Sequence, residues 1–444
     1  MKQLLPPGPR PDPVVGNLLA FRRDPLQFFT ACAQEYGEVA HFRILNAHAY
    51  LLSNPDHIES VLVRNSANFI KGRVFRSNRL LLGDGLLTSE GGLWRRQRRL
   101  AQPAFHKDRV SSYMGTIQTL AESMAAGWRD GEVRDVYQEM KGLALKIIAR
   151  ILFDVDVASD ADEVSSALRA AWEEFTARIQ SGLLIPESVP TRGNLRFQRA
   201  VGNLDRVIRR IIEERRMGRQ GGGDCLSLLL EAQDSDGSQM TDTQLRDEVM
   251  TLLVAGHEST ALALTWTWYL LARNPEKAEP LYAEADALGR EALSVRGMAG
   301  LPYSEMVVKE ALRLYPPVWA IPRQAVKDCE IGGYSVPAGT SLTISQWVMH
   351  RHPHYFAEPA SFRPERWADG LEKQLPDFVY FPFGGGPRHC IAYSLAMVEA
   401  VLVMAILART FEFSVLSEPP AVAWPSITLY PRYGIRARIQ RRGH

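Results

Sequence analysis

The spacing of apolar positions along the chain predicts mostly helix, with a smaller amount of strand. From Asp24 to Gly37, in DPLQFFTACAQEYG, apolar residues recur at helical spacing and the segment ends at a glycine, as a capped helix does. EVAHFRI and AYLLS follow, and both are typical of short strands. Helical periodicity then runs from Pro103 to about Arg273, and strand-like pieces return from Pro316 to Pro364. We therefore expect a mainly α fold with minor β parts near residues 38–65 and 316–365.

One helical stretch, TDTQLRDEVMTLLVAGHESTALALTWTWYLLARNP, is unusually long and has polar residues at its centre. Thr241 or Thr243 can cap its start and an Asn-Pro pair ends it, which predicts roughly 30 residues, or about 45 Å of helix. Residues 252–271 are apolar nearly all round and should be buried. Within them, residues 256–260 add a carboxylate and two hydroxyls, which are costly to bury without partners. The centre is either a satisfied polar kink or a functional site.

Composition narrows the class of protein. Of the 444 residues, 46% are hydrophobic and 23% are charged, which provides enough apolar material for a large core. The net charge of +2 argues against a nucleic-acid binder. Without an internal repeat or a linker, the pattern predicts one domain over residues 1–444. No run approaches the roughly 20 apolar residues of a spanning helix, so we expect a soluble protein without a transmembrane anchor.

The four cysteines lie far apart and form no CxxC pair, which argues against a disulfide framework or a structural zinc site. A reducing, cytoplasmic location fits this usage. Cys390 differs from the others because a glycine run and an arginine precede it, in FPFGGGPRHCIAYSLA, and an apolar segment follows. A phosphate-binding loop would end in Gly-Lys-Ser/Thr, so that interpretation fails. A buried structural cysteine, a nucleophile at a helix N-terminus and a thiolate ligand of haem iron remain open.

Four motifs resemble those of the cytochrome P-450 superfamily. FGGGPRHCIA (383–392) resembles the family's cysteine-ligand loop, and AGHEST (255–260) resembles its oxygen-binding helix kink. KEALRLYPP (309–317) is similar to its Glu-x-x-Arg helix, and FRPERW (362–367) to its Pro-Glu-Arg-Phe segment. The resemblance spans nearly the whole chain, is closest to soluble bacterial members, and favours the thiolate interpretation of Cys390.

The resemblance implies the P-450 fold, in which haem b lies between a long distal helix and the cysteine loop. Cys390 is then the iron ligand. A buried ionic cluster of Glu310, Arg313 and Arg366 is implied to hold the cysteine loop in place. The remaining implied haem contacts, with the arginines on the propionates, are Trp94, Arg98, Arg323, Phe383, Arg388 and Ala392.

The activity that the resemblance implies is a monooxygenase that inserts one atom of O2 into a C–H bond. Glu258, Ser259 and Thr260 are the implied catalytic residues, and Glu258 and Ser259 form the proton-delivery pair. The family usually has threonine directly after the acid, so we expect Ser259, which lacks the methyl group that restrains χ1, to allow more leakage of reduced oxygen. The alternatives are a peroxide-driven hydroxylase or a non-monooxygenase member of the same fold and, from another class, a haem sensor or carrier protein.

The expected partners are electron-transfer proteins. Because no reductase domain follows the haem domain in the sequence, we expect electrons from a separate ferredoxin or flavodoxin type of protein with its reductase. We also expect a monomer. The other arginines of WRRQRR (94–99) are expected to face solvent, where an acidic electron donor can dock by electrostatic steering.

The expected substrate is elongated and hydrophobic. GDGLLTSEGGLW (83–94) resembles a loop that runs over the haem in fatty-acid-hydroxylating and carotenoid-hydroxylating relatives, which implies that Leu87 lies near the iron. A fatty acid, terpenoid or carotenoid fits an apolar pocket. Each apolar position has a simple core role as its alternative. The other residues of the expected pocket are Ala255, Val318, Trp319 and Ile321.

Overall fold

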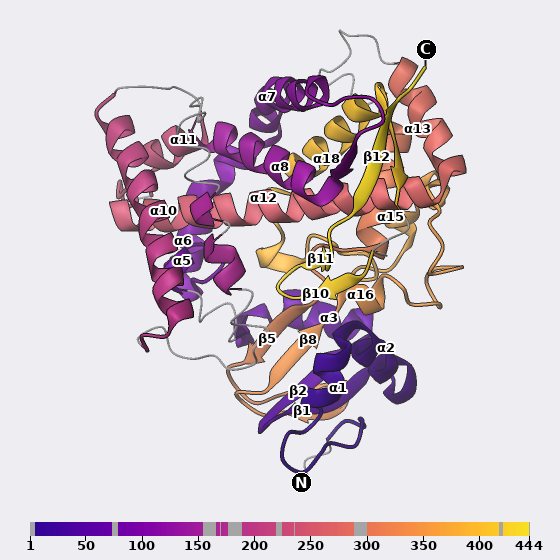
Figure 1. Cartoon of the computed structure of the whole chain (residues 1–444). Helices are drawn as coiled ribbons and strands as arrows, with labels where there is room; N and C mark the ends of the chain where they lie inside the picture. Colours follow the sequence, from indigo (N-terminus) through magenta and orange to yellow (C-terminus); the bar gives the residue numbers. More distant parts are fainter. Residues whose placement is uncertain are drawn as a thin grey trace. The chain divides into compact units, whose positions relative to one another are not determined.

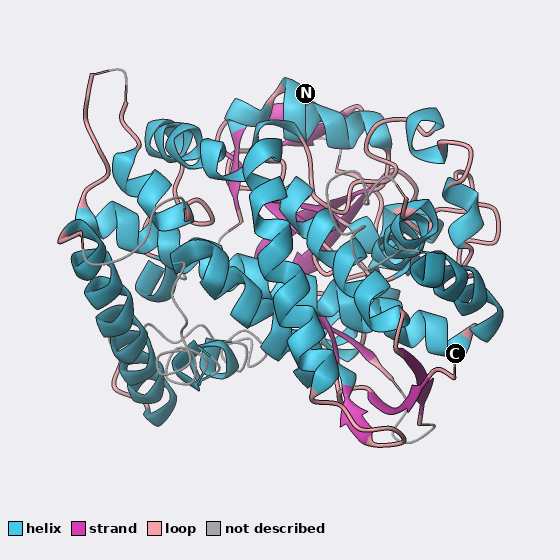
Figure 2. Cartoon of the chain, turned by 90° about the horizontal axis from the view of Figure 1, so that it is seen from above, coloured by secondary structure: helices cyan, strands magenta, loops and turns pink. Residues whose placement is uncertain are grey.

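The structure is a computed structural model, and it confirms the mainly helical architecture with minor sheets (Figure 2). It describes residues 5–72, 79–153, 166–168, 170–175, 189–218, 224–234, 236–287, 300–416 and 421–443. The chain divides into two compact units, one formed by Met1–Arg73 with Lys309–Cys390 and the other by Val74–Val308 with Ile391–His444. A single haem-binding domain over residues 1–444 stays a prediction.

The first unit is built on a five-stranded sheet of order β1-β2-β8-β5-β3. β1 and β2 form an antiparallel hairpin, β2 pairs in parallel with β8, and β5 pairs antiparallel with both β8 and β3. The strands predicted at EVAHFRI, at AYLLS and after residue 316 are confirmed. The strands of this unit are β1 (Val39–Ile44), β2 (Ala47–Leu52), β3 (Phe69–Lys71), β5 (Ile321–Ala325), β6 (Cys329–Ile331), β7 (Tyr334–Val336) and β8 (Ser341–Ile344).

Helix α2 (Pro25–Tyr36) confirms the helix predicted from DPLQFFTACAQEYG. Its N-cap Asp24 accepts a hydrogen bond from a first-turn N–H, and Gly37 ends it at a φ of 84°. Phe28 and Phe29 pack on Phe42 of β1, with ring centroids 5.6 Å apart in both pairs. The other helical segments are α1 (Leu18–Arg23), α3 (Pro55–Glu59), η1 (Ser60–Arg64), η2 (Ser66–Asn68), α16 (Gln346–Met349), η4 (Pro364–Trp367), α17 (Leu371–Gln374) and η5 (Gly386–Arg388).

The second unit is mainly helical (Figure 1). It also holds a three-stranded sheet of order β4-β12-β9 and a β10-β11 hairpin. These strands lie outside the two predicted β parts, because β4 (VRD) and β12 (RARIQR) carry few apolar residues. The strands are β4 (Val133–Asp135), β9 (Phe411–Val415), β10 (Ala423–Pro425), β11 (Leu429–Pro431) and β12 (Arg436–Arg441). The helical segments are α5 (Arg79–Leu82), α6 (Gly91–Ala101), η3 (Gln102–Phe105), α7 (Lys107–Ala126), α8 (Val136–Phe153), α10 (Arg192–Arg216), α11 (Cys225–Glu231), α12 (Asp242–Arg273), α13 (Pro275–Ala287) and α18 (Tyr393–Ala408).

The bounds of α12 confirm the predicted long helix. Thr241 and Gln244 form a reciprocal capping box at its start, and Asn274 caps its end. The helix packs along α8 (Figure 1). Gly256 permits this close approach, because a Cβ atom there would lie 2.8 Å from Cγ1 of Ile148.

Helix α18 follows the cysteine loop directly in sequence and is buried along most of its length. Its one carboxylate, Glu399, is 3% exposed, and burial raises the pKa of that carboxyl to about 8. Across the described ranges, no helix is long and apolar enough to cross a lipid bilayer.

Candidate active site

The cysteine loop is a tight turn that depends on glycine. Gly384 and Gly386 have φ values of 71° and 65°, a conformation that residues with a Cβ atom disfavour. At Gly386 a Cβ atom would also overlap the Leu62 carbonyl oxygen. The Cys390 N–H donates to the Phe383 carbonyl oxygen at 3.0 Å and closes the turn. The loop therefore presents a half-buried Cys390 on a backbone with little freedom to move.

The other three cysteines have environments that keep them as neutral thiols. Burial raises the pKa of Cys32 and of Cys225 to about 12, and it also raises the pKa of Cys329. A thiolate ligand needs an accessible sulfur beside backbone that leaves room for a flat macrocycle. Of the four, Cys390 alone stands in a glycine turn, so its loop fits a haem iron ligand.

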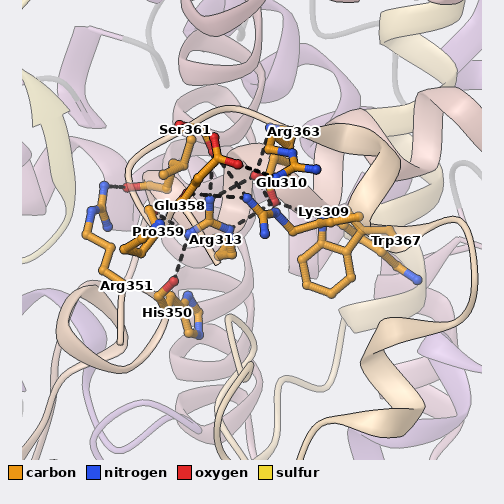
Figure 3. Close-up of polar contacts among 12 residues, drawn as sticks. Lys309, Glu310, Arg313, His350, Arg351, Glu358, Pro359, Ser361, Arg363 and Trp367 are labelled. Atoms are coloured by element: carbon orange, nitrogen blue, oxygen red, sulfur yellow. Dashed lines mark hydrogen bonds and ion pairs between the residues drawn. The ribbon is translucent and has the colours of Figure 1, made fainter. Parts of the chain in front are cut away.

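A buried cluster around Glu310 joins three segments of the first unit, namely the end of α15 (Pro302–Leu314), the end of α16 and residues 359–367 (Figure 3). The family resemblance implied the pairs of Glu310 with Arg313 and Arg366. Glu310, on α15, pairs with Arg313 at 2.8 and 2.9 Å and with Arg366 at 2.9 Å. It also accepts hydrogen bonds from the Arg363 N–H at 2.9 Å and the Trp367 indole at 3.0 Å. All the acceptor positions of the carboxylate are thus used.

Arg313 carries the cluster toward two neighbouring segments. Its guanidinium donates to the carbonyl oxygens of His350, Pro359 and Ser361 at 2.7 to 3.0 Å (Figure 3). Both Glu310 and Arg313 are fully buried. A buried pair is stable only when its remaining donors and acceptors are also satisfied, which is the case here.

His350 is a positioning residue that the sequence motifs do not indicate. Its Nε2 accepts a hydrogen bond from the Phe381 N–H at 3.0 Å, where the cysteine-loop segment begins. Burial, with Arg313 and Arg351 nearby, holds the pKa of His350 well below its usual value, so the ring is neutral and can accept. The only sequence signal is a histidine among aromatic and basic residues, MHRHPHY, which is not specific.

The middle of α12 has one open face. From Leu245 to Trp268 all residues are buried except Ala255, Gly256 and Ser259. Gly256 packs closely on Ile148 of α8, so the open face is that of Ala255 and Ser259, which lie one turn apart. Their side chains are small, so this face leaves room for a bulky group. Thr260 is 5% exposed and lies off this face, which distinguishes it from Ser259 among the predicted hydroxyls.

Glu258 does not bond to Ser259 but to α8. Its Oε1 accepts a hydrogen bond from the Tyr137 hydroxyl at 2.5 Å, and its Oε2 lies 3.5 Å from Lys141 Nζ. The carboxylate is 2% exposed. Burial, then the Glu258 charge, raises the pKa of Tyr137 well above its ordinary value, so this tyrosine is a donor. Ser259 instead donates to the Ala255 carbonyl oxygen at 2.7 Å.

His257 completes the surroundings of Glu258. Its Nε2 lies 3.6 Å from Glu258 Oε2, and its Nδ1 lies 3.1 Å from the Leu253 carbonyl oxygen. Burial lowers the pKa of His257, which favours the neutral ring with the proton on Nδ1. Tyr137 and Lys141 were not predicted, because a sequence motif covers neighbouring residues. The contact between Tyr137 and Glu258 joins positions 121 residues apart.

The predicted haem arginines fall in both units. Trp94 and Arg98 lie on α6, with the indole 9% exposed, and Arg323 lies on β5 and Arg388 at the end of η5. Ala392 is the residue before the first turn of α18. Their contacts with haem propionates stay predictions.

The expectation that the remaining arginines of α6 face solvent is wrong for Arg96. Its guanidinium is 22% exposed and pairs with Asp234 at 3.1 Å. Arg99 pairs with the same carboxylate at 2.6 Å. Asp234 is distant in sequence, so a helical charge pattern alone could not show this pairing.

The predicted pocket residues are also divided between the two units. Leu87 and Ala255 belong to the second unit, and both are at least partly exposed. In the first unit Val318 and Ile321 are half-buried, whereas Trp319 is 7% exposed and packs on Phe29, with centroids 5.7 Å apart. Trp319 therefore has the core role that was the alternative for each apolar position.

Comparison with known proteins shows similarity over nearly the whole chain. A family model described as cytochrome P450 matches residues 6–432. Cyclooctatin synthase of Streptomyces melanosporofaciens is 37% identical over 400 residues, which cover 89% of this chain and 87% of the relative. Cyclooctat-9-en-7-ol 5-monooxygenase of the same organism is 35% identical over 89% of this chain and 86% of its own.

Two further similarities extend to both ends of the chain. Pentalenene oxygenase of Streptomyces avermitilis is 32% identical over 97% of this chain and 96% of its own. The solved structure of retinoic acid bound cyanobacterial CYP120A1 matches with a TM-score of 0.88 at 24% identity, and the match covers 100% of both chains. This structural similarity shows a common fold.

Proposed function

Because the chain belongs to the cytochrome P450 family and is a haem-dependent monooxygenase, we propose that it hydroxylates a terpenoid. The observation that carries the substrate class is that two relatives, 35% and 32% identical over 89% and 97% of this chain, are named as a monooxygenase of cyclooctat-9-en-7-ol and an oxygenase of pentalenene. Both named substrates are terpenoids. The small, apolar open face of α12 at Ala255 is compatible with a bulky, rigid hydrocarbon. Fatty acids and carotenoids are the competing substrates.

Haem supplies the iron that activates O2 when it is bound. We assign the iron ligand to Cys390 and the form of the cofactor to haem b. The propionates would pair with Trp94, Arg98, Arg323 and Arg388, whose cationic and N–H donors suit carboxylates. Phe383 and Ala392 belong to the turn that carries the ligand.

Glu258 is proposed to pass protons to the substrate side of α12. Lys141 is 18% exposed and is the solvent-side partner of this carboxylate. Tyr137 donates to the other oxygen and keeps the carboxylate turned toward α8. Ser259, on the open face, would accept the proton on its hydroxyl oxygen and release its own hydroxyl hydrogen, which the Ala255 carbonyl oxygen now holds at 2.7 Å, toward the substrate side. Thr260, being buried, is the weaker candidate.

Electrons come from redox partners, and we propose a ferredoxin or flavodoxin type of protein with its reductase. Exposed Arg95 on α6 remains available for an acidic donor, whereas Arg96 and Arg99 are both engaged by Asp234. A monomer is proposed for the enzyme itself.

The test uses the haem-loaded protein with surrogate ferredoxin, reductase and NAD(P)H. Spin-state titrations and product analysis compare a terpenoid panel with fatty acids and carotenoids. We expect the tightest binding and hydroxylation with terpenoids, and a preference for fatty acids would overturn the proposal. Omitting NAD(P)H and adding peroxide tests the peroxide-driven alternative.

Variants of two cysteines test the assignment of the iron ligand. Cys390→Ser should abolish the thiolate-type Soret shift of the reduced, carbon monoxide-bound protein. Cys329→Ser, at a half-buried position on β6, is the matched control and should keep the shift. Equal spectra from both variants would exclude Cys390 as the ligand.

A further inference from the structure

The segment that leads to Leu87 is hydrogen-bonded to two carboxylates of α12. The Asp84 N–H donates to Asp247 Oδ2 at 2.8 Å. The Leu86 N–H donates to Glu248 Oε2 at 3.2 Å in a buried position. Asp247 is 6% exposed and Glu248 is fully buried. Burying two adjacent carboxylates is costly, so their use as acceptors for one segment indicates a specific role.

Two glycines let this segment lie directly on the helix. A Cβ atom at Gly83 would overlap the Asp247 carboxylate, and Gly83 also has a φ of 53°. A Cβ atom at Gly85 would overlap Thr251 Oγ1 and would lie 2.5 Å from the Asp247 carbonyl oxygen. Any other residue at either position would push the segment off α12.

The segment is also braced internally. The Thr88 hydroxyl, which is fully buried, donates to the Gly83 carbonyl oxygen at 2.7 Å and lies 3.1 Å from that of Gly85. Leu86 is 8% exposed, whereas the next residue, Leu87, is half-buried. The position of Leu87 is therefore set by a turn that has few ways to relax.

A chain of charges connects this contact to α10. Arg246 pairs with Asp247 at 2.9 Å, and its guanidinium also pairs with Asp205 of α10. Only 6% of the Arg246 side chain is exposed. A negative, a positive and a negative side chain therefore follow one another from Asp205 of α10, through Arg246, to Asp247, which accepts the hydrogen bond from the segment.

These contacts lie on the same ridge of α12 as its open face. Asp247, Thr251, Ala255 and Ser259 are each four residues apart, and side chains at that spacing form one row along a helix. The segment rests on the first two members of the row.

We propose that Asp247 and Glu248 are positioning residues that fix the segment Gly83–Thr88 on α12 and so determine substrate specificity through Leu87. The Asp205–Arg246 pair links this contact to α10. The effect on specificity rests on the proposed function, whereas the effect on the segment does not.

The first experiment measures hydrogen exchange in the substrate-free, haem-loaded protein. Glu248→Leu keeps the bulk and removes the acceptor for the Leu86 N–H, whereas Glu248→Gln keeps an oxygen. We expect exchange of the peptide containing residues 83–88 to rise about tenfold in Glu248→Leu and to change little in Glu248→Gln. Wild-type exchange in Glu248→Leu would overturn the proposal.

The second experiment adds a methyl group at Gly85, which should displace the segment from α12. Gly85→Ala should raise KM, change the ratio of hydroxylated products and leave the thiolate Soret shift intact. Gly92→Ala is the control, because a Cβ atom there meets nothing within 4 Å. Unchanged product ratios in Gly85→Ala, or equal changes in both variants, would contradict the specificity role.

The two experiments separate the possible failures. If the wild type hydroxylates no terpenoid, the proposed function fails, and the exchange experiment still tests the segment. If terpenoids are hydroxylated but Gly85→Ala behaves as wild type, the positioning role fails alone.

Discussion

Glu310 and Glu258 are both buried carboxylates, but they differ in how completely their oxygens are hydrogen-bonded. Glu310 accepts five hydrogen bonds at 2.8 to 3.0 Å, and two guanidinium groups neutralise it. Glu258 has the Tyr137 hydroxyl at 2.5 Å and one amine at 3.5 Å. Among the described residues, no donor forms a hydrogen bond with its Oε2.

This difference separates a structural acid from the acid that we propose to carry protons. Glu310 cannot move without breaking several charge-assisted bonds, so it holds its segments in place. Glu258 has one oxygen without a hydrogen bond from the described residues, which suits the proposed role. Glu399 is a third case, because burial raises the pKa of its carboxyl to about 8.

The largest effect is expected from Glu310→Gln. The change leaves two buried guanidinium groups without a counter-charge, which should lower the free energy of unfolding by about 3–5 kcal/mol. Urea unfolding and haem content after purification measure it. Glu358→Gln removes the partner of an exposed pair with Arg363 and should cost less than about 1 kcal/mol. If the two variants were equally stable, the cluster would not hold the unit together.

The next effect concerns the pH dependence of Glu399. Its folded pKa, about 8, is above the unfolded value, so the folded state binds the extra proton and loses stability as pH rises from about 4.5 to 8. The slope is about 1.4 kcal/mol per pH unit. Glu399→Gln should remove this slope and become more stable than the wild type near pH 8. If the stability of both proteins changed in the same way between pH 5 and 8, the prediction would be wrong.

Glu258→Gln should affect catalysis more than stability. Losing a positioned proton donor typically costs about 10²-fold in rate, so we expect kcat to fall by that order with more reduced oxygen released unused. Product formation per NAD(P)H consumed and the solvent isotope effect measure it. Glu139→Gln, on the neighbouring helix α8, is the control and should keep the coupling. If Glu258→Gln kept the wild-type solvent isotope effect and the wild-type ratio of product to NAD(P)H, Glu258 would not belong to the proton route.

The smallest effect is expected from Tyr137→Phe. Deleting one hydrogen bond to a charged group should cost about 1.5–3 kcal/mol of unfolding free energy. A double-mutant cycle with Glu258→Gln should recover most of that value as coupling. Tyr113→Phe removes a 3.3 Å bond to a neutral carbonyl and should cost less. Additive effects in the cycle would show that the Tyr137 contact contributes nothing.

The predictable parts of the fold and site are those with local signals. The signals for the helix ends are local: Asp24 and Thr241 cap helix starts, and Gly37 ends α2. The periodicity of α12 is likewise a pattern among nearby residues. The Glu310–Arg313 pair lies one helical turn apart, and the resemblance of its motif to the family's Glu-x-x-Arg helix indicated it. The cysteine turn was recognisable because its glycines and Cys390 lie close together in sequence.

The sequence by itself determined where α2 and α12 begin and end and which cysteine stands in a glycine turn, because these depend on neighbours within about one turn. Only the tertiary structure decided which partners the acids bind. Tyr137 reaches Glu258, and Asp247 and Glu248 hold Asp84 and Leu86, across more than 100 residues. Such pairings depend on how helices pack, and many sequences with the same periodicity could pack the same acids against other groups.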